Sequence, residues 1–177
     1  WKILNNINVV IDIQKLKTIK MLVLDVDGIL TDCKITLDSN GEWKRFYSVR
    51  DGVGIKALIE NNYKVAIITG ANAIDVRARV KMLGVHYLYE GKTDKMPAFL
   101  DLQEKSGLSP DEMAYMGDDF SDIPLLEKVK FSATVPDAMD EVITSVQYIT
   151  KRPAGNGAVR EICDYILKYG FYANNNW

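Results

Sequence analysis

The stretch Met21-Leu22-Val23-Leu24-Asp25-Val26-Asp27-Gly28-Ile29-Leu30-Thr31-Asp32 decides the fold of this chain. Its first four residues are apolar and lack helical spacing, which predicts a strand buried on both faces, as in a parallel sheet. Asp25 and Asp27 follow at the carboxyl end of that strand, where open α/β sheets bind their ligands. An extended chain would point both carboxylates to the same side. A polar turn that only caps the strand is the alternative interpretation.

The composition is that of an ordinary soluble globular protein, and one domain is expected over residues 1–177. The net charge of −2 offers no basic field for nucleic acid or an anionic membrane. No apolar run approaches the roughly 20 residues that span a bilayer, and the N-terminus lacks the layout of a signal peptide. Cys33 and Cys163 are expected to be reduced thiols, so the sequence predicts a cytoplasmic protein.

Strand-like and helix-like segments alternate along the chain, which predicts an α/β fold with a Rossmann-like, doubly wound and mostly parallel sheet. The predicted strands cover 21–24, 64–70, 85–89, 112–116, 131–135 and 148–150. The predicted helices cover 53–62, 73–83, 95–106, 123–129, 136–143 and 157–169. Residues 1–18 are expected to form a helical lead-in, and residues 171–177 a flexible tail.

Residues 34–47 have the pattern of a β-hairpin, with Asn40 and Gly41 in its turn. The hairpin is expected to project from the sheet and to carry Trp43, Phe46 and Tyr47 on its arms. Because an isolated hairpin is marginally stable in water, another protein surface is expected to cover it.

Polar side chains follow four of the predicted strands, at the edge where the carboxyl ends of parallel strands meet. They are Asp25, Asp27, Thr69, Lys95, Asp118, Asp119 and Asp122. Carboxylates this close together need a cation, and oxygen ligands without Cys or His favour Mg²⁺. A lysine and a hydroxyl beside that cation can balance the charge of a phosphate. The pattern therefore indicates phosphoryl transfer onto a carboxylate.

The chain resembles the haloacid dehalogenase superfamily of phosphatases through four motifs in the family's order, namely Asp25-Val26-Asp27-Gly28, Thr69-Gly70, Lys95 and Gly117-Asp118-Asp119 with Asp122. The likeness extends over residues 21–166. Further segments are similar to the 3-deoxy-D-manno-octulosonate 8-phosphate phosphatase subfamily, namely Thr31-Asp32, Ser48-Val49-Arg50-Asp51-Gly52 and Ala154-Gly155-Asn156-Gly157-Ala158-Val159-Arg160-Glu161. That subfamily also contains phosphatases of nine-carbon sialic-type sugar acids.

The resemblance implies a role for each reacting group. Asp25 would attack phosphorus and become an aspartyl-phosphate. Asp27 would protonate the departing sugar oxygen and then take a proton from the water that hydrolyses the intermediate. Thr69, Gly70 and Lys95 would bind the phosphate oxygens.

The resemblance also implies a set of metal ligands. Mg²⁺ would be held by the Asp25 carboxylate, the Asp27 backbone carbonyl and the Asp118 carboxylate. Asp119 and Asp122 would orient the waters of the ion. No cofactor other than Mg²⁺ is implied.

The motif spacing leaves no room for the cap domain that many members of the superfamily insert. Because water must be kept from the site during leaving-group protonation, a neighbouring subunit is expected to serve as the lid. Capless relatives form tetramers in which the hairpins assemble and a Gly-rich C-terminal segment reaches a neighbour's site. The resemblance therefore implies a homotetramer in which residues 152–157 cover the site of another subunit.

The substrate implied by the resemblance is an acidic sugar phosphate, either the octulosonate 8-phosphate or a nonulosonate 9-phosphate. The substrate-binding residues would be Ser48-Val49-Arg50-Asp51-Gly52, Lys56 and Arg79. Two positions depart from the octulosonate pattern, because Ala71 and Lys56 stand where those enzymes usually carry arginine. Losing a fork-shaped anion binder leaves the reaction class unchanged but the preferred sugar open.

Two other functions fit parts of the pattern. A similar non-catalytic module follows some acylneuraminate cytidylyltransferases and serves oligomerisation, although here every reactive position is present. A phosphoacceptor signalling domain also combines Asp, Thr, Lys and Mg²⁺. Asp27 argues against that domain, because an acid/base group there would shorten the lifetime of its acyl-phosphate.

Overall fold

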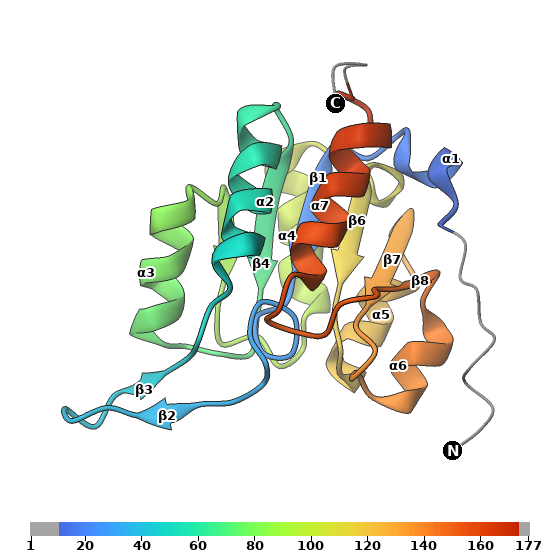
Figure 1. The fold of residues 1–177 in the computed structure, drawn as a ribbon. Coiled ribbons are helices and arrows are strands. Elements are labelled where there is room, and N and C mark those ends of the chain that lie inside the picture. Colours follow the sequence, from blue (N-terminus) through green and yellow to red (C-terminus); the bar gives the residue numbers. More distant parts are fainter. Residues whose placement is uncertain (1–10, 174–177) are drawn as a thin grey trace.

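The computed structural model describes residues 11–173, and within that range one six-stranded sheet forms the centre of the molecule. Its strands are β1 Met21–Leu24, β4 Lys64–Ile68, β5 Tyr87–Tyr89, β6 Met113–Met116, β7 Phe131–Thr134 and β8 Tyr148–Ile149. Their order is β5-β4-β1-β6-β7-β8, and each neighbouring pair is parallel (Figure 1). The predicted mostly parallel, Rossmann-like sheet is confirmed.

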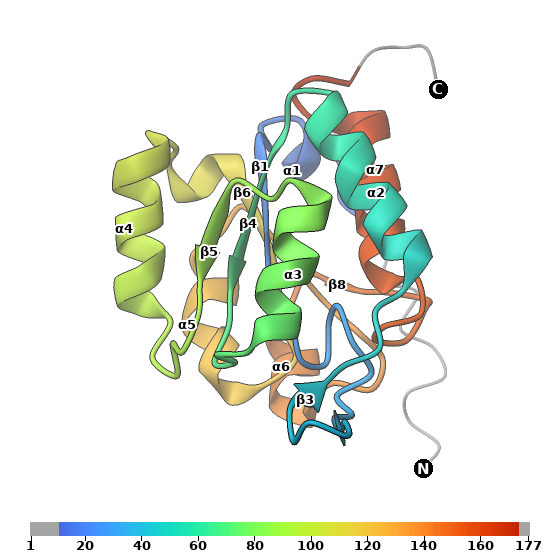
Figure 2. The same ribbon diagram turned by 90° about the vertical axis from the view of Figure 1, so that its left-hand side faces the viewer.

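Helices cover both faces of this sheet, as Figure 2 shows from its side. One face packs against α1 Ile13–Leu16, α2 Val49–Glu60, α3 Ile74–Leu83 and α7 Ala158–Tyr169. The other face packs against α4 Met96–Ser106, α5 Ile123–Leu126 and α6 Asp140–Ser145. From β1 the chain runs to β4 and β5 on one side and then enters β6 on the other side of β1. The strand order therefore reverses next to β1, which is where doubly wound sheets open a crevice at their carboxyl ends.

Strand β1 supplies both layers of the core. Leu22 and Leu24 pack toward α2 and α7, whereas Met21 and Val23 pack toward α4 and α5. All four side chains are buried, and each such burial contributes about 1.5–3 kcal/mol to folding. The apolar run is therefore continuous rather than alternating because both faces of the strand are covered.

The predicted hairpin is present as β2 Thr36–Leu37 and β3 Trp43–Lys44, which pair antiparallel and extend from the carboxyl edge of the sheet (Figure 1). The Asp38 carboxylate accepts hydrogen bonds from the backbone N–H groups of Asn40 and Glu42, which closes the turn. Trp43 is 53% exposed and Phe46 is 73% exposed. Tyr47 differs from the prediction, because its ring is half-buried against the core.

Several predicted helix bounds were wrong. Helix α2 begins at Val49 rather than at residue 53, because Ser48 caps it by accepting from the Asp51 N–H. Helix α6 covers 140–145 rather than 136–143, since residues 136–139 form a turn. The lead-in contains the helix Ile13–Leu16, and its residues 1–10 lie outside the described residues.

The predicted tail, 171–177, is only partly described. The Phe171 N–H donates to the Ile19 carbonyl, and the Tyr172 N–H donates to the Tyr63 hydroxyl. These bonds anchor residues 171 and 172 against the body of the protein, and residues 174–177 lie outside the described range. Both Cys33 and Cys163 are free thiols. Among residues 11–173, none of the helices has the length and apolar character needed to span a membrane.

Candidate active site

The carboxyl ends of β4, β1 and β6 lie at one level and form the floor of a cleft. Leu24 is paired in register with both Ile67 and Met116, so the residues that follow the three strands emerge side by side. The cleft has a volume of about 370 Å³. It is lined by Asp25, Asp27, Cys33, Thr69, Gly70, Ala71, Lys92, Thr93, Lys95, Asp118, Asp119 and Ser121. The structure thus brings together all the predicted reacting and phosphate-binding residues.

Lys95 is the buried cation of this cleft. Its ammonium group lies 2.9 Å from Asp25 Oδ1 and 2.5 Å from Asp122 Oδ1, and its side chain is 3% exposed. Burial disfavours the charged amine, but the two carboxylates outweigh that effect and raise the pKa of Lys95. A positive charge therefore stands next to the predicted nucleophile.

Asp122 has its hydrogen-bonding capacity filled by the protein. One carboxylate oxygen accepts from Lys95 and from the buried Tyr115 hydroxyl. The other accepts from the backbone N–H groups of Asp118 and Asp119, each at 3.1 Å. Gly117 makes this approach possible, because a Cβ at that position would collide with the Asp122 carboxylate. Asp122 thus orients Lys95 and the loop after β6.

The donor set fits a divalent cation. Carboxylate oxygens of Asp25, Asp118 and Asp122 lie within 4.8 Å of one another. Those of Asp25 and Asp118 are the ones left for an ion, because the Asp122 oxygens already accept four hydrogen bonds. Asp118 Oδ1 is buried and has no hydrogen-bond partner within residues 11–173, which is costly unless an ion or water completes it. Gly28 has a φ of +85°, and a Cβ there would collide with the Asp118 carboxylate. A side chain at residue 28 would therefore displace the Asp118 carboxylate.

The acids of the cluster resist carrying their charges together. Burial, together with repulsion from Asp122, raises the pKa of Asp25 to about 7, although Lys95 opposes the shift. Burial and the charges of Asp25, Asp122 and Asp119 raise the pKa of Asp118 to about 7 as well. An added cation would favour the ionised forms of both, as expected of a metal-binding set.

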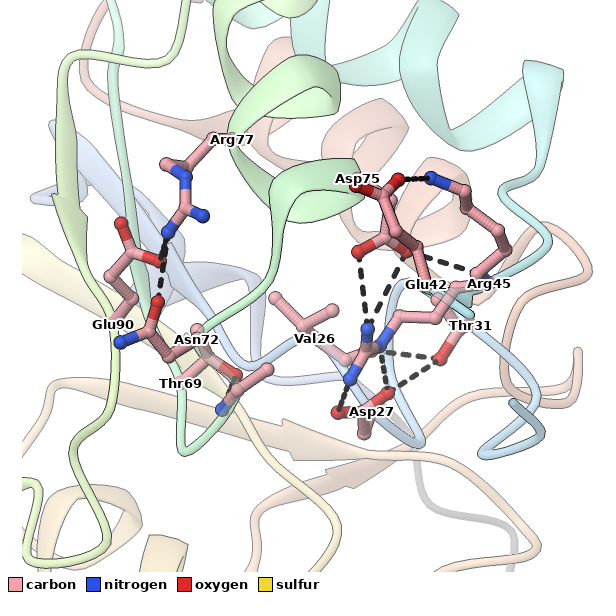
Figure 3. Close-up of polar contacts among 12 residues, drawn as sticks. Val26, Asp27, Thr31, Glu42, Arg45, Thr69, Asn72, Asp75, Arg77 and Glu90 are labelled. Carbon is pink, nitrogen blue, oxygen red and sulfur yellow. Dashed lines mark hydrogen bonds and ion pairs between the residues drawn. The ribbon is translucent and has the colours of Figure 1, made fainter. Parts of the chain in front are cut away.

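The remaining predicted groups of the cleft lie as follows. The buried Thr69 Oγ1 accepts from the Ala71 N–H at 3.1 Å, which leaves its own hydrogen free to donate. The Asp119 carboxylate accepts from the Phe120 N–H and caps the 3₁₀ turn Phe120–Asp122. Asp27 lines the cleft, but its carboxylate is paired with Arg45 (Figure 3).

The predicted substrate-binding residues do not line this cleft. Asp51 is buried and accepts from the backbone N–H groups of Gly157 and Arg160, so it caps α7. Arg79 donates to the Ser48 carbonyl at 2.8 Å, and Gly52 lies against it. The remaining predicted members, Val49, Arg50 and Lys56, are exposed on α2.

Arg50 takes part in a separate cavity of about 400 Å³, which Arg152, Gly157, Arg160, Glu161 and Asp164 also line. This cavity joins the start of α2 to the Gly-rich segment 152–157. That segment packs on its own chain, where the Gly155 N–H donates to the Ile29 carbonyl. A Cβ at Gly155 would collide with the backbone at Thr31 and Asp32, so the glycine permits this contact.

Sequence reasoning missed three residues that hold the site in place. Tyr115 could have been found, because a phenol in the middle of an apolar strand needs a hydrogen-bond partner. Arg45 and Asp75 carried no local signal, because their pairing depends on how the hairpin meets α3 (Figure 3).

Comparison with known families gives a match to the haloacid dehalogenase-like hydrolase model over residues 85–162. The chain is also 44% identical over 155 residues to the 3-deoxy-D-manno-octulosonate 8-phosphate phosphatase KdsC of Escherichia coli strain K12. That alignment covers 88% of this chain and 82% of the relative.

Two solved structures are similar along most of their length. The 3-deoxy-D-manno-octulosonate 8-phosphate phosphatase of Yersinia pestis has a TM-score of 0.88 and 38% identity, with 91% of this chain and 87% of that one covered. The phosphatase of the same name from Moraxella catarrhalis, in complex with magnesium, phosphate and a KDO molecule, has a TM-score of 0.87 and 38% identity. That match covers 91% of this chain and 92% of the Moraxella chain.

Proposed function

Because this chain belongs to the haloacid dehalogenase-like hydrolases and, within them, to the 3-deoxy-D-manno-octulosonate 8-phosphate phosphatase subfamily, we propose that it hydrolyses that sugar phosphate through an aspartyl-phosphate. The chain is an enzyme, a phosphatase of phosphate monoesters. The observation that carries the proposal is the contact of Asp25 with the buried ammonium group of Lys95, in a cleft that also holds Asp27, Thr69 and Asp118.

The proposed chemistry uses two carboxyl groups in turn. Asp25 attacks phosphorus, and the bond from phosphorus to the sugar oxygen breaks. Asp27 gives its proton to that oxygen and later takes one from the attacking water, which releases phosphate and restores both groups. Lys95, the Thr69 hydroxyl and the Gly70 backbone bind the oxygens of the transferring group.

The cation proposed for the site is Mg²⁺. It would be held by the Asp25 carboxylate, the Asp27 backbone carbonyl and the Asp118 carboxylate, with Asp119 orienting its waters. Asp122 would act through the backbone of Asp118 and Asp119 rather than on the waters, because its carboxylate is occupied by protein donors. Mg²⁺ at such a site neutralises phosphate charge and favours ionised carboxylates. Two observations support a cation with oxygen ligands. Asp118 Oδ1 is buried and has no partner among the described residues, and the lining residues include no His and a single Cys, Cys33.

One residue of the cleft keeps two sugar substrates possible. Ala71 lines the cleft where the octulosonate enzymes usually carry arginine, and an alanine cannot bind a carboxylate. This favours a nonulosonate 9-phosphate as the second candidate substrate.

A phosphate-release screen with both sugar acid phosphates tests this choice. We expect kcat/KM to be highest for 3-deoxy-D-manno-octulosonate 8-phosphate, and Ala71→Arg to raise it further if position 71 contacts the sugar acid. A preference of more than about tenfold for the nonulosonate phosphate would overturn the primary assignment, since such a ratio corresponds to about 1.4 kcal/mol of transition-state binding.

We propose that the enzyme works as a homotetramer. The hairpin and the start of α2 expose an apolar strip that consists of Ile35, Leu37, Trp43, Phe46, Val49 and Val53. A cavity of about 440 Å³ lies between Phe46 and the Gly-rich residues Gly155 and Asn156. A second copy of the chain would cover the strip and bring its own residues 152–157 toward the site.

Light scattering coupled to size exclusion tests the assembly. We expect the mass of four chains at micromolar concentration, and a shift to smaller species in Trp43→Asp, because a charge would then be buried in the interface. A monodisperse wild-type monomer that is fully active would contradict both the tetramer and the proposed lid.

A further inference from the structure

Three charged side chains form a chain of ion pairs beside the cleft, drawn in Figure 3. Arg45 binds both oxygens of Asp27, with Nε 2.6 Å from Oδ1 and Nη2 3.0 Å from Oδ2. The third guanidinium nitrogen, Nη1, lies 3.2 Å from Asp75 Oδ1, and the Arg45 backbone N–H also donates to Asp75 at 3.0 Å. A residue that follows the hairpin strand β3 thus connects α3 to the loop after β1.

This connection is buried and therefore well defined. The Arg45 side chain is 8% exposed and that of Asp75 is 10% exposed. An arginine side chain is charged at any pH at which the protein is folded, so Arg45 remains a cation between the two carboxylates. A paired fork of this kind fixes direction as well as distance, which an exposed lysine–carboxylate pair does not. Asp75 in the first turn of α3 anchors the arginine at both its backbone and its side chain.

The pairing also determines which oxygen of Asp27 can transfer a proton. Oδ1 accepts from Arg45 Nε and, at 3.4 Å, from the Thr31 hydroxyl. Oδ2 accepts from Arg45 Nη2 only, among the described residues. Because each carboxylate oxygen has two acceptor positions, Oδ2 keeps one of them free. The Asp27 side chain is 33% exposed and Asp27 lines the cleft, so a substrate bound there can reach its carboxylate.

We propose that Arg45, anchored by Asp75, is a positioning residue that holds Asp27 so that Oδ2 faces the reacting oxygen. The inference rests on the proposed function, in which Asp27 is the general acid and base. Oδ2 takes up a proton from solvent at its free acceptor position and gives it to the sugar oxygen as the phosphorus–oxygen bond breaks, while Arg45 keeps its own protons throughout. The second step returns a proton from water to the same oxygen.

Leaving-group dependence tests this role. A sugar alkoxide needs a proton as it departs, whereas p-nitrophenolate does not, so a misplaced acid should slow the two substrates unequally. For Arg45→Ala we expect kcat/KM to fall about 10- to 100-fold with 3-deoxy-D-manno-octulosonate 8-phosphate and by less than about 3-fold with p-nitrophenyl phosphate. Asp75→Asn should show a smaller version of the same difference between the two substrates. Arg45→Lys should retain more kcat/KM with the sugar phosphate than Arg45→Ala does.

Arg77→Ala is the matched control. Arg77 lies on α3, as Asp75 does, and pairs with Glu90 instead of Asp27 (Figure 3). It should leave kcat/KM unchanged with both substrates. Adding Arg45→Ala to Asp27→Asn should cost less than about 3-fold, since the arginine then has no acid to position. Thermal unfolding shows whether each variant is folded, and Arg45→Lys serves if the alanine variant is not.

The two possible failures can be told apart. The positioning role would be overturned if kcat/KM fell equally with both substrates in folded Arg45→Ala and Arg45→Lys. It would also be overturned if Arg45→Ala lowered kcat/KM by its full factor in the Asp27→Asn background. In either case the phosphatase assignment stands. Unchanged activity in Asp27→Asn would remove the proposed acid/base itself.

Discussion

Replacing Asp25 by asparagine is expected to abolish turnover while the fold is kept. The amide oxygen in place of the Asp25 carboxylate could still accept a hydrogen bond from Lys95, but the amide cannot attack phosphorus. We expect kcat to fall on the order of 10⁴-fold or more, as removal of a nucleophile does in other covalent mechanisms. Phosphate release under saturating Mg²⁺ and sugar phosphate measures this loss.

The stability of the same variant separates chemistry from folding. Burial and the neighbouring Asp122 disfavour the ionised form of Asp25, which is why its pKa is raised to about 7. Removing that charge should therefore leave Tm unchanged or slightly higher. Ser121→Ala, at another position lining the cleft, is the matched control and should retain most activity. Wild-type-like hydrolysis by folded Asp25→Asn would falsify the nucleophile assignment.

Removing divalent cations is expected to abolish activity and to lower the stability of the fold. Without the cation, Asp25 and Asp118 repel each other and the Asp118 Oδ1 atom stays unpaired. Treatment with EDTA should abolish phosphate release, and Mg²⁺ should restore it. Mg²⁺ at 100 times its dissociation constant should also add about 2.7 kcal/mol to the free energy of unfolding, because it binds the folded state alone.

The rise in Tm with Mg²⁺ can be measured without any substrate. It should vanish in Asp118→Asn, which removes a ligand charge, and persist in Asp101→Asn, which changes an acid on the surface of α4 that pairs with Lys105. Activity that ignores EDTA, or an equal Tm shift in Asp118→Asn, would contradict the metal site.

Most of the sheet could be predicted because its strands carry their own signal. Met21–Leu24 is a short apolar run that ends at carboxylates, and only a strand covered on both faces satisfies that pattern. The start of α2 was missed because Gly52 and Gly54 disfavour a helix locally. The need for a glycine at position 54 comes from tertiary packing. A Cβ at Gly54 would press on Arg160 and Cys163 of α7, so the glycine lets α2 and α7 approach closely.

The convergence of Asp25, Thr69 and Lys95 could be predicted for the same topological reason, since parallel strands end at one edge. The partners of Asp27 could not be. Arg45 lies 18 residues away from Asp27 along the chain and Asp75 a further 30, and no periodicity connects a hairpin arm to the first turn of α3. The role of Asp51 as the cap of α7 could not be predicted either, because it depends on how α2 and α7 pack together.

The central claim is that the phosphoryl group passes through Asp25 on its way to water. The stereochemical course at phosphorus tests this most directly, with a sugar phosphate made chiral by oxygen isotopes and sulfur and hydrolysed in isotopically labelled water. Two in-line displacements, first by Asp25 and then by water, each invert the configuration at phosphorus. We therefore expect net retention of that configuration. Net inversion would mean that water attacks the substrate directly, and it would contradict the account.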